Sequence, residues 1–271
     1  MKTIESAGTS LSYTIHGSGP AVLLIQGVGV VGNGWQPQIE ALENRFTLVA
    51  FDNRGIGRST LGGTLTIDGM AADALSIMDA EKIERFHVVG HSMGGVIAHA
   101  LALRAPERVC SLALLCTFAR GSDGSKVTLP MLMTALRMRI GTRAMRRNAF
   151  LELIMPERYL QEVDRVALAA RLAPLFGHDL AEQPSIVMKQ LRAMSAYDAG
   201  TSLSRLAHIP TLVVSAAEDR IAQPASGRAL AAAIPNANYL EIADAGHGLP
   251  IHRANEVNAL LADLWTTKCE M

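Results

Sequence analysis

No net charge, no long apolar run and no cysteine framework are found in this sequence of 271 residues. Lys plus Arg and Asp plus Glu both number 25, so the formal net charge is zero. Nucleic acids and anionic membranes attract proteins that carry an excess of basic residues. We therefore expect neither as a partner, and we expect a small-molecule substrate instead.

The three cysteines, Cys110, Cys116 and Cys269, are odd in number and lack the CxxC spacing of redox or metal-binding motifs. No group of His, Asp and Glu residues has ligand spacing either, so we expect no metal. The N-terminal segment MKTIESAGTS contains no apolar signal region, and no apolar run reaches the ~18 residues of a membrane span. These absences favour a soluble, cytoplasmic protein, and they leave its oligomeric state open.

Aromatic residues make up only 4% of the chain, but apolar residues make up 49%, which is enough for a large aliphatic core. Short apolar runs typical of buried strands alternate with helical patterns near both ends of the chain. We expect strands at 11–16, 21–25, 46–51, 86–89, 111–116, 211–215 and 238–242, and helices at 37–43, 69–80, 93–104, 225–233 and 251–265. This alternation predicts an α/β fold with a mostly parallel sheet and helices on both faces.

The middle of the chain shows no strand pattern. From about residue 126 to residue 206 the pattern is helical and is interrupted by four prolines. We therefore predict a helical cap at 120–206, inserted into a core formed by 1–119 and 207–271. Seven of the 12 methionines lie in this cap, Met133 and Met188 among them. Such flexible side chains suit the wall of a pocket for apolar substrates.

A serine lies at the centre of the segment Gly90-His91-Ser92-Met93-Gly94-Gly95, which joins an apolar strand to an apolar helix. A serine at the apex of such a turn needs a strained backbone, which small flanking residues tolerate. The turn would project the hydroxyl above the sheet edge, next to the positive end of the helix dipole. The segment predicts Ser92 as a nucleophile.

A serine hydroxyl needs a base, and the base needs an orienting acid. His247 follows the last predicted strand, and Asp219 follows the strand before it, so both belong at the carboxyl edge of the sheet. The other histidines lie on strands, inside helices or near the cap, except that His91, beside Ser92, is expected to point the wrong way to be its base and His252 falls in the first turn of the last helix. Glu218 and Asp244 are the alternative acids. The order Ser92, Asp219, His247 is the one expected for this type of fold.

Taken together, GHSMGG, the segment FDNRGIGRS, PTLVVSAAED and AGHG resemble the α/β-hydrolase superfamily, in particular its small capped esterases and lactonases. The resemblance implies a sheet of the eight-stranded type, no cofactor, and an oxyanion hole formed by the backbone N–H groups of Val28 and Met93. It also implies that the substrate lies near the loop before Val28 and under the cap, where we expect contacts from Gln26, Gly27, Trp35, Met133 and Met188. Many relatives have His-Gly where this chain has Gln26-Gly27, so substrate preference and reaction type stay open.

Two other interpretations of the sequence remain. Residues 27–32 read GVGVVG, and Asp52 follows 20 residues later, as in a dinucleotide-binding fingerprint. Asn33 to Pro37 favour a loop where that fingerprint needs a helix, so a flexible oxyanion loop is the better explanation. The triad also occurs in perhydrolases, carbon–carbon hydrolases and lyases, and the fold can serve as a slow ligand receptor. Cleavage of a small or medium apolar ester or lactone through an acyl-enzyme on Ser92 is the main hypothesis.

Overall fold

A single eight-stranded sheet forms the centre of the computed structural model, which describes residues 1–125 and 129–266. The strand order is β1-β2-β4-β3-β5-β6-β7-β8. Strands β1 and β2 pair antiparallel, β2 runs antiparallel to β4, and every other pair is parallel. The strand bounds are β1 Lys2–Ser6, β2 Thr9–His16, β3 Ala21–Ile25, β4 Thr47–Phe51, β5 Phe86–His91, β6 Val109–Leu115, β7 Thr211–Ala216 and β8 Asn238–Ile242.

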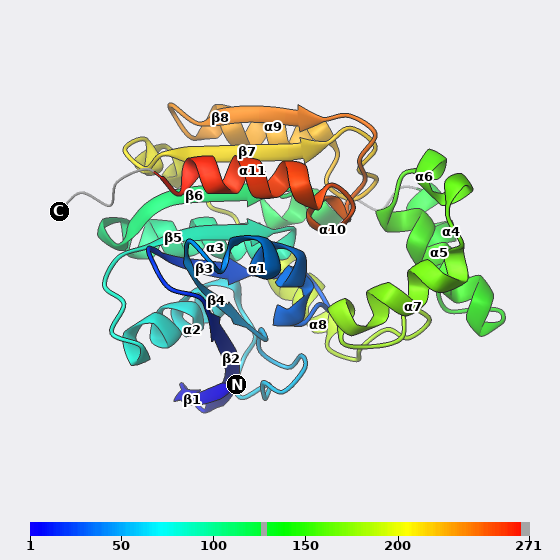
Figure 1. Cartoon of the computed structure of the whole chain (residues 1–271), viewed down its shortest axis with the longest axis horizontal. Coiled ribbons are helices and arrows are strands. Elements are labelled where there is room, and N and C mark those ends of the chain that lie inside the picture. Colours follow the sequence, from blue (N-terminus) through cyan, green and yellow to red (C-terminus); the bar gives the residue numbers. More distant parts are fainter. Residues whose placement is uncertain (126–128, 267–271) are drawn as a thin grey trace.

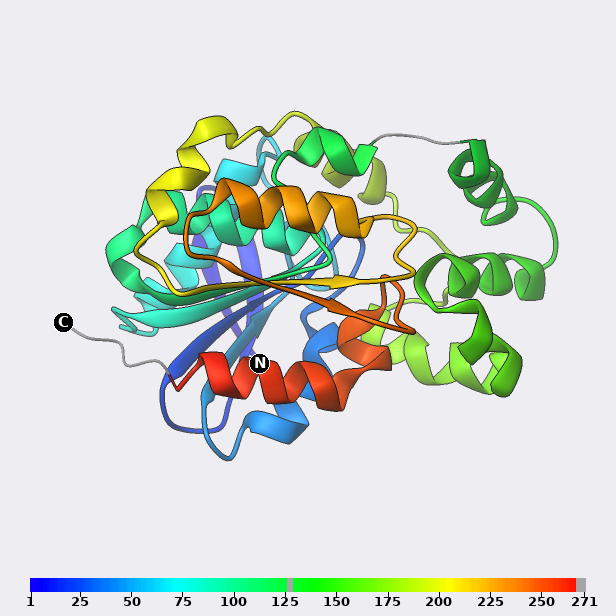
Figure 2. The ribbon, with the colours of Figure 1, turned by 90° about the horizontal axis from the view of Figure 1, so that it is seen from above.

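Helices cover both faces of the sheet, as Figure 2 shows: α1 and α11 lie on one face, and α2, α3 and α9 on the other. These helices bury apolar side chains against the sheet, which is why the central strands are apolar on both faces. The bounds are α1 Gln36–Leu42, α2 Ile67–Ala80, α3 Met93–Arg104, α9 Pro224–Ala233, α10 Leu249–His252 and α11 Ala254–Leu264, with short 3-10 helices at Gly32–Trp35 and Pro106–Arg108. The predicted α/β class with a mostly parallel sheet is confirmed.

Two details differ from the sequence-based expectation. The strand at Lys2–Ser6 has no counterpart among the expected strands, because it lies at the sheet edge, where its residues are largely exposed and carry little hydrophobic signal. The final helix is divided at Arg253 into α10 and α11. The order of elements and the carboxyl ends of the central strands agree with the prediction.

The segment between β6 and β7 is helical where it is described, and α4 to α7 stand beyond the carboxyl edge of the sheet (Figure 1). Apolar side chains of this segment form a second hydrophobic cluster, which includes Leu151, Leu172 and Phe176. Val30, from the loop after β3, belongs to the same cluster. Arg120 and Asp198 pair as an isolated bridge, so the two ends of the segment meet. Its helices are α4 Leu129–Arg137, α5 Arg143–Ile154, α6 Glu157–Glu162, α7 Arg165–Phe176 and α8 Val187–Ser195, with 3-10 helices at Gly121–Ser125 and Gly200–Leu206. The division into core and cap stays a prediction, and we use the word cap for residues 120–206.

Within the described residues, none of the helices combines the length and the apolar character that crossing a membrane requires.

Candidate active site

Ser92 lies at the turn between β5 and α3 with φ 56° and ψ −123°, a strained conformation for a residue with a side chain. Glycine is required around it because a Cβ on Gly90 would lie 2.2 Å from the Gly94 carbonyl oxygen, and one on Gly94 would lie 2.1 Å from the Ile25 oxygen. The Ser92 N–H donates to the Leu115 carbonyl at 3.0 Å, and the Thr117 hydroxyl donates to the Ser92 carbonyl at 2.6 Å. The strained turn is therefore held from the neighbouring strand.

His247 and Asp219 come together at the same edge of the sheet. The Nδ1 of His247 lies 2.8 Å from Oδ2 of Asp219, and both side chains are buried. The other carboxylate oxygen of Asp219 accepts from the backbone N–H groups of Ile221, at 2.7 Å, and Ala222, at 2.8 Å. The carboxylate is thereby oriented by two backbone donors, and it orients the imidazole in turn.

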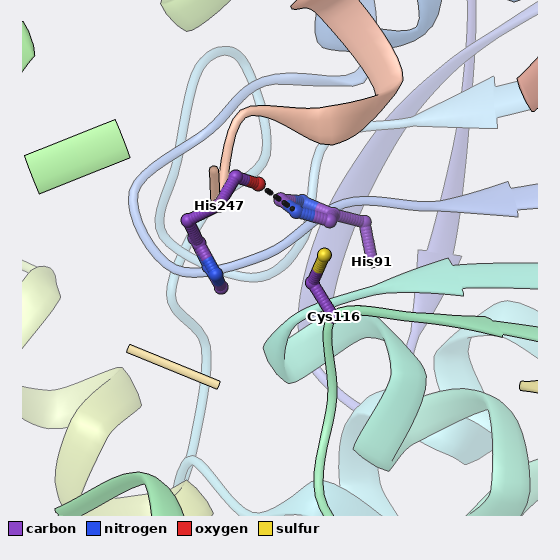
Figure 3. A group of neighbouring side chains, drawn as sticks. All are labelled: His91, Cys116 and His247. Atoms are coloured by element: carbon purple, nitrogen blue, oxygen red, sulfur yellow. Dashed lines mark hydrogen bonds between the residues drawn. The ribbon is translucent and has the colours of Figure 1, made fainter. Parts of the chain in front are cut away.

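His91, the residue before Ser92, lies against His247 (Figure 3). Its Nε2 is 2.8 Å from the backbone carbonyl of His247, and the two ring centroids are 4.9 Å apart. A carbonyl oxygen only accepts, so Nε2 of His91 carries the proton and donates. Burial, followed by the neighbouring charge of His247, lowers the pKa of His91 to about 3, which keeps this imidazole neutral. The contact places His247 directly beside the nucleophile turn.

The thiol of Cys116 completes this group from the end of β6, and in Figure 3 it points toward the two imidazoles. Cys116 is fully buried, has φ 47°, and its thiol lies near the Asp219 carboxylate. Burial above all, and then the charge of Asp219, raises the pKa of the thiol well above its usual value. The raised pKa keeps the thiol protonated and uncharged beside the acid of the pair. His91 and Cys116 were not predicted as site residues; the position of Cys116 at a strand end next to β5 was the available signal.

The potential ligand atoms of His91, Cys116 and His247 all lie within 4.8 Å of one another, and such a set is compatible with a metal such as zinc. Two of the three residues already have other roles here. The His247 ring is bonded to Asp219, and the His91 ring donates to the His247 carbonyl. These contacts therefore fit side chains that surround the His247–Asp219 pair better than they fit the ligands of a metal centre.

The loop after β3 meets the nucleophile turn from the other side. A Cβ on Gly27 would lie 3.0 Å from the Ser92 Cβ and 3.5 Å from its Oγ, so the loop passes directly over the hydroxyl. Met93 is the first residue of α3, where a backbone N–H has no helical acceptor, and Val28 follows Gly27 at the half-buried rim of the loop. These positions are compatible with the two predicted oxyanion donors, whose role stays a prediction.

Gln26, predicted to contact substrate, is buried and turned toward its own loop. Its side-chain oxygen accepts from the Gly27 N–H at 3.3 Å, and its backbone carbonyl accepts from the Asn53 side chain at 2.9 Å. Trp35 is fully buried in the main core, whereas Met133 and Met188 are exposed on the cap. The structure thus brings Gly27 to Ser92 and packs Trp35 into the core, and the role of Gln26, Trp35, Met133 and Met188 in substrate binding stays a prediction.

Asp52, the acid of the dinucleotide-like fingerprint, has structural partners. Its carboxylate accepts from the N–H groups of Gly32, at 2.8 Å, and Arg58, at 3.0 Å. Residues 32–35 form a 3-10 helix rather than the loop expected from the sequence, and α1 follows it at once. Arg54 does not pair with Asp52 but forms a buried ion pair with Asp73. Asp52, which would bind the ribose in a dinucleotide site, instead accepts hydrogen bonds that stabilise the turn.

Comparisons with known proteins agree with this geometry. A family model described as "alpha/beta hydrolase fold" matches residues 20–254. A protein of Azorhizobium caulinodans, "Putative carbamate hydrolase RutD", is 32% identical over 96% of this chain and 97% of its own length. Among solved structures, the enol-lactonase from Burkholderia xenovorans LB400 superposes with a TM-score of 0.81 at 30% identity, over 98% of this chain and 100% of that one. Est816, described as an N-acyl homoserine lactone degrading enzyme, has a TM-score of 0.79 at 26% identity, over 97% and 99% of the two chains.

Proposed function

Since this chain belongs to the alpha/beta hydrolase fold family, we propose that it is a serine hydrolase that cleaves a small or medium carboxylic ester or lactone. Ser92 is the nucleophile, His247 the general base and Asp219 the acid that orients it. The observation that carries the proposal is the buried His247–Asp219 pair beside the strained serine turn, because this arrangement supplies a proton acceptor next to the turn that presents the hydroxyl.

The proposed reaction begins when His247 removes the proton from the Ser92 hydroxyl and the oxygen attacks the carbonyl carbon. The negative charge on the carbonyl oxygen is stabilised by the N–H groups of Val28 and Met93, which are fixed by the backbone and need no reorganisation. The His247 imidazolium then protonates the leaving alcohol, or the ring oxygen of a lactone. Water, deprotonated by His247, then attacks the acyl-enzyme; the bond to Ser92 breaks, the Ser92 oxygen takes the proton back from His247, and the acid is released.

Lactones and esters are favoured as substrates by the similarity to two solved proteins described as acting on lactones, which extends over nearly the whole chain. A carbamate is the second candidate, because the Azorhizobium relative bears that name and the same acyl transfer would cleave it. A carbamate carbonyl is less electrophilic than that of an ester, so esters and lactones should react faster in this site.

The test is hydrolysis of p-nitrophenyl esters, simple lactones and carbamates by the wild type and by Ser92→Ala. We expect a burst of nitrophenol from the wild type, covalent labelling by a fluorophosphonate, and loss of both in Ser92→Ala. Ser204→Ala is the matched control, because Ser204 is exposed on the 3-10 helix Gly200–Leu206, where its hydroxyl donates to the Thr201 carbonyl, and this variant should still be labelled. Full activity of Ser92→Ala would refute the proposal, and a wild type that gives neither burst nor label would favour a receptor.

A further inference from the structure

Gly29, in the loop after β3, is held by two side chains of the cap. Its N–H donates to Oε1 of Gln190 at 2.8 Å, and its carbonyl oxygen lies 3.2 Å from Nε2 of His178. Gly29 has φ 70°, and a Cβ there would lie 3.0 Å from the Val187 side chain. Both polar backbone groups of Gly29 therefore contact the cap, which comes close enough to favour a residue without a side chain.

The loop itself has little support from the sheet. Residues 27–30 form no backbone–backbone hydrogen bond with any residue that the structure describes. The Gly27 N–H is bonded to the Gln26 side chain at 3.3 Å, and the polar groups of Gly29 are bonded to the cap. Where the backbone of a segment has no ladder of its own, its position depends on the side chains that satisfy its polar groups.

The two cap side chains differ in how firmly they hold Gly29. Gln190 is fully buried on α8, and its oxygen faces Gly29 because a backbone N–H requires an acceptor. In His178, Nδ1 also faces a carbonyl oxygen, that of Asp179, at 2.9 Å. A neutral imidazole has one N–H and donates to only one of the two carbonyls. Gln190 is therefore the constant contact, and His178 adds to it.

Gly29 lies two residues from the loop position that passes over the Ser92 hydroxyl, where a Cβ on Gly27 would be 3.0 Å from the Ser92 Cβ. The Val28 N–H belongs to the peptide unit before Val28, the Gly29 N–H belongs to the unit after it, and each unit is planar. Only the φ and ψ angles of Val28 thus separate the group bonded to Gln190 from the N–H proposed to bind the oxyanion.

We propose that Gln190 and His178 are positioning residues: by holding Gly29 they fix the Val28 N–H, so the oxyanion hole depends on the contact between the cap and the loop after β3. This inference rests on the proposed function and adds its dependence on the cap. An oxyanion donor is effective because it is fixed before charge develops. Loosening Gly29 therefore slows the attack by Ser92 and leaves the binding of the uncharged ester unchanged.

The test follows the nitrophenol burst from p-nitrophenyl butyrate at increasing ester concentration. The rate constant of the burst measures acylation, the concentration that gives half of the maximal rate constant measures ester binding, and the amplitude measures the fraction of active enzyme. Gln190→Met keeps the length of the side chain and removes the acceptor. We expect its burst rate constant to be about tenfold lower than that of the wild type, the effect of one lost hydrogen bond, with ester binding and amplitude unchanged.

Lys189→Met, at an exposed neighbouring position of the same helix, is the matched control and should keep the wild-type rate constant. If Gln190 serves only the packing of the cap, Gln190→Met will lower the amplitude, because less enzyme is folded, and leave the rate constant unchanged. That result overturns the proposal.

His178 gives a second pair of variants at a half-buried position, where a substitution threatens folding less. His178→Gln keeps a donor for the Gly29 carbonyl, and His178→Leu removes it. We expect a burst rate constant near that of the wild type in His178→Gln and one several-fold lower in His178→Leu. Equal rate constants in these two variants overturn the role of His178, also when Gln190→Met does not fold.

Failure of this inference can be told from failure of the proposed function. If the wild type gives a burst that is absent in Ser92→Ala, while Gln190→Met and His178→Leu keep the wild-type rate constant, the serine mechanism stands and the positioning role falls. If the wild type gives neither a burst nor a fluorophosphonate label, the serine mechanism itself is wrong, and with it the inference that depends on it.

Discussion

The imidazole of His91 donates a hydrogen bond to the backbone carbonyl of His247, with 2.8 Å between Nε2 and the oxygen. The two residues are 156 positions apart, and one of them precedes the proposed nucleophile while the other is the proposed base. The bond therefore joins the serine turn directly to the loop that carries the base. It holds the backbone of His247 while Asp219 holds its ring.

Removal of this bond should slow catalysis. In His91→Ala we expect kcat to fall about 10- to 100-fold. The reason is that displacing the His247 imidazole by about 1 Å from the Ser92 hydroxyl has an effect of that size on the rate. KM should change little, since His91 is not proposed to contact substrate. In His91→Gln, whose amide can still donate, most of the activity should return. Steady-state kinetics of the two variants provide the measurement, and an unimpaired His91→Ala would contradict the positioning role.

Replacement of Cys116 should test whether a hydrogen-bond donor beside Asp219 matters for catalysis. The protonated thiol lies near the Asp219 carboxylate, so Cys116→Ser, which keeps a donor, should retain most of kcat, whereas Cys116→Val should lose about tenfold. Melting temperatures of both variants would show whether a loss of activity merely reflects a loss of stability. Equal kcat in the two variants would show that the contact with Asp219 does not matter for catalysis.

Chemical modification offers a second measurement on the same residue. Burial and the nearby carboxylate raise the pKa of the Cys116 thiol well above its usual value, and the side chain is fully buried. Only the thiolate reacts readily with alkylating reagents. We expect Cys116 to resist iodoacetamide in the folded protein at neutral pH and to react after unfolding, as judged by peptide mass spectrometry. Rapid modification of Cys116 in the folded state would contradict this arrangement.

Replacing Gly27 by alanine should lower activity more than it lowers the stability of the fold. The added Cβ would lie 3.0 Å from the Ser92 Cβ and 3.5 Å from its Oγ, in the space where a substrate carbonyl must fit. Gly27→Ala should therefore lower kcat/KM by at least about 100-fold, while overpacking lowers the free energy of unfolding by only about 1–3 kcal/mol. Gly63→Ala is the control, since its Cβ would meet nothing within 4 Å. An active Gly27→Ala enzyme would mean that substrate approaches Ser92 from elsewhere.

Acid should destabilise the fold through two histidines outside the site. Burial lowers the pKa values of His87 and His99 to about 4, and both side chains are essentially inaccessible. Between about pH 6.5, the ordinary pKa of histidine, and pH 4, the unfolded chain binds protons that the folded chain does not. The free energy of unfolding therefore falls as the pH is lowered through this range, by up to about 1.4 kcal/mol per pH unit for each histidine.

Urea unfolding at several pH values measures this effect. His87→Asn retains a side chain that can bond the Ser111 hydroxyl, the partner of His87 at 2.8 Å, but it removes the titrating group. Its unfolding free energy should depend less steeply on pH between 6.5 and 4 than that of the wild type. An unchanged slope would show that His87 does not contribute to acid lability.

Local sequence was sufficient to place the three residues proposed for catalysis. One short segment contains the apolar strand, the glycines around Ser92 and the following helix. The tight turn follows from this segment because only glycine fits on either side of the serine. Asp219 and His247 were predicted because the carboxyl ends of parallel strands meet at one edge of a sheet, and the resemblance to the α/β-hydrolase superfamily favoured Asp219 over Glu218. The sheet class followed from the same alternation of apolar runs and helical patterns.

Only the tertiary structure decided which side chains surround these residues. Trp35 follows the loop after β3 in sequence but is packed into the core, and Met133 and Met188 are exposed on the cap. Gln190, which no motif distinguishes, reaches Gly29, and His91 reaches the carbonyl of His247. The reason is physical: strand and turn positions follow from short-range periodicity and sterics, whereas the face that a cap helix turns toward the sheet depends on packing between segments far apart in the chain.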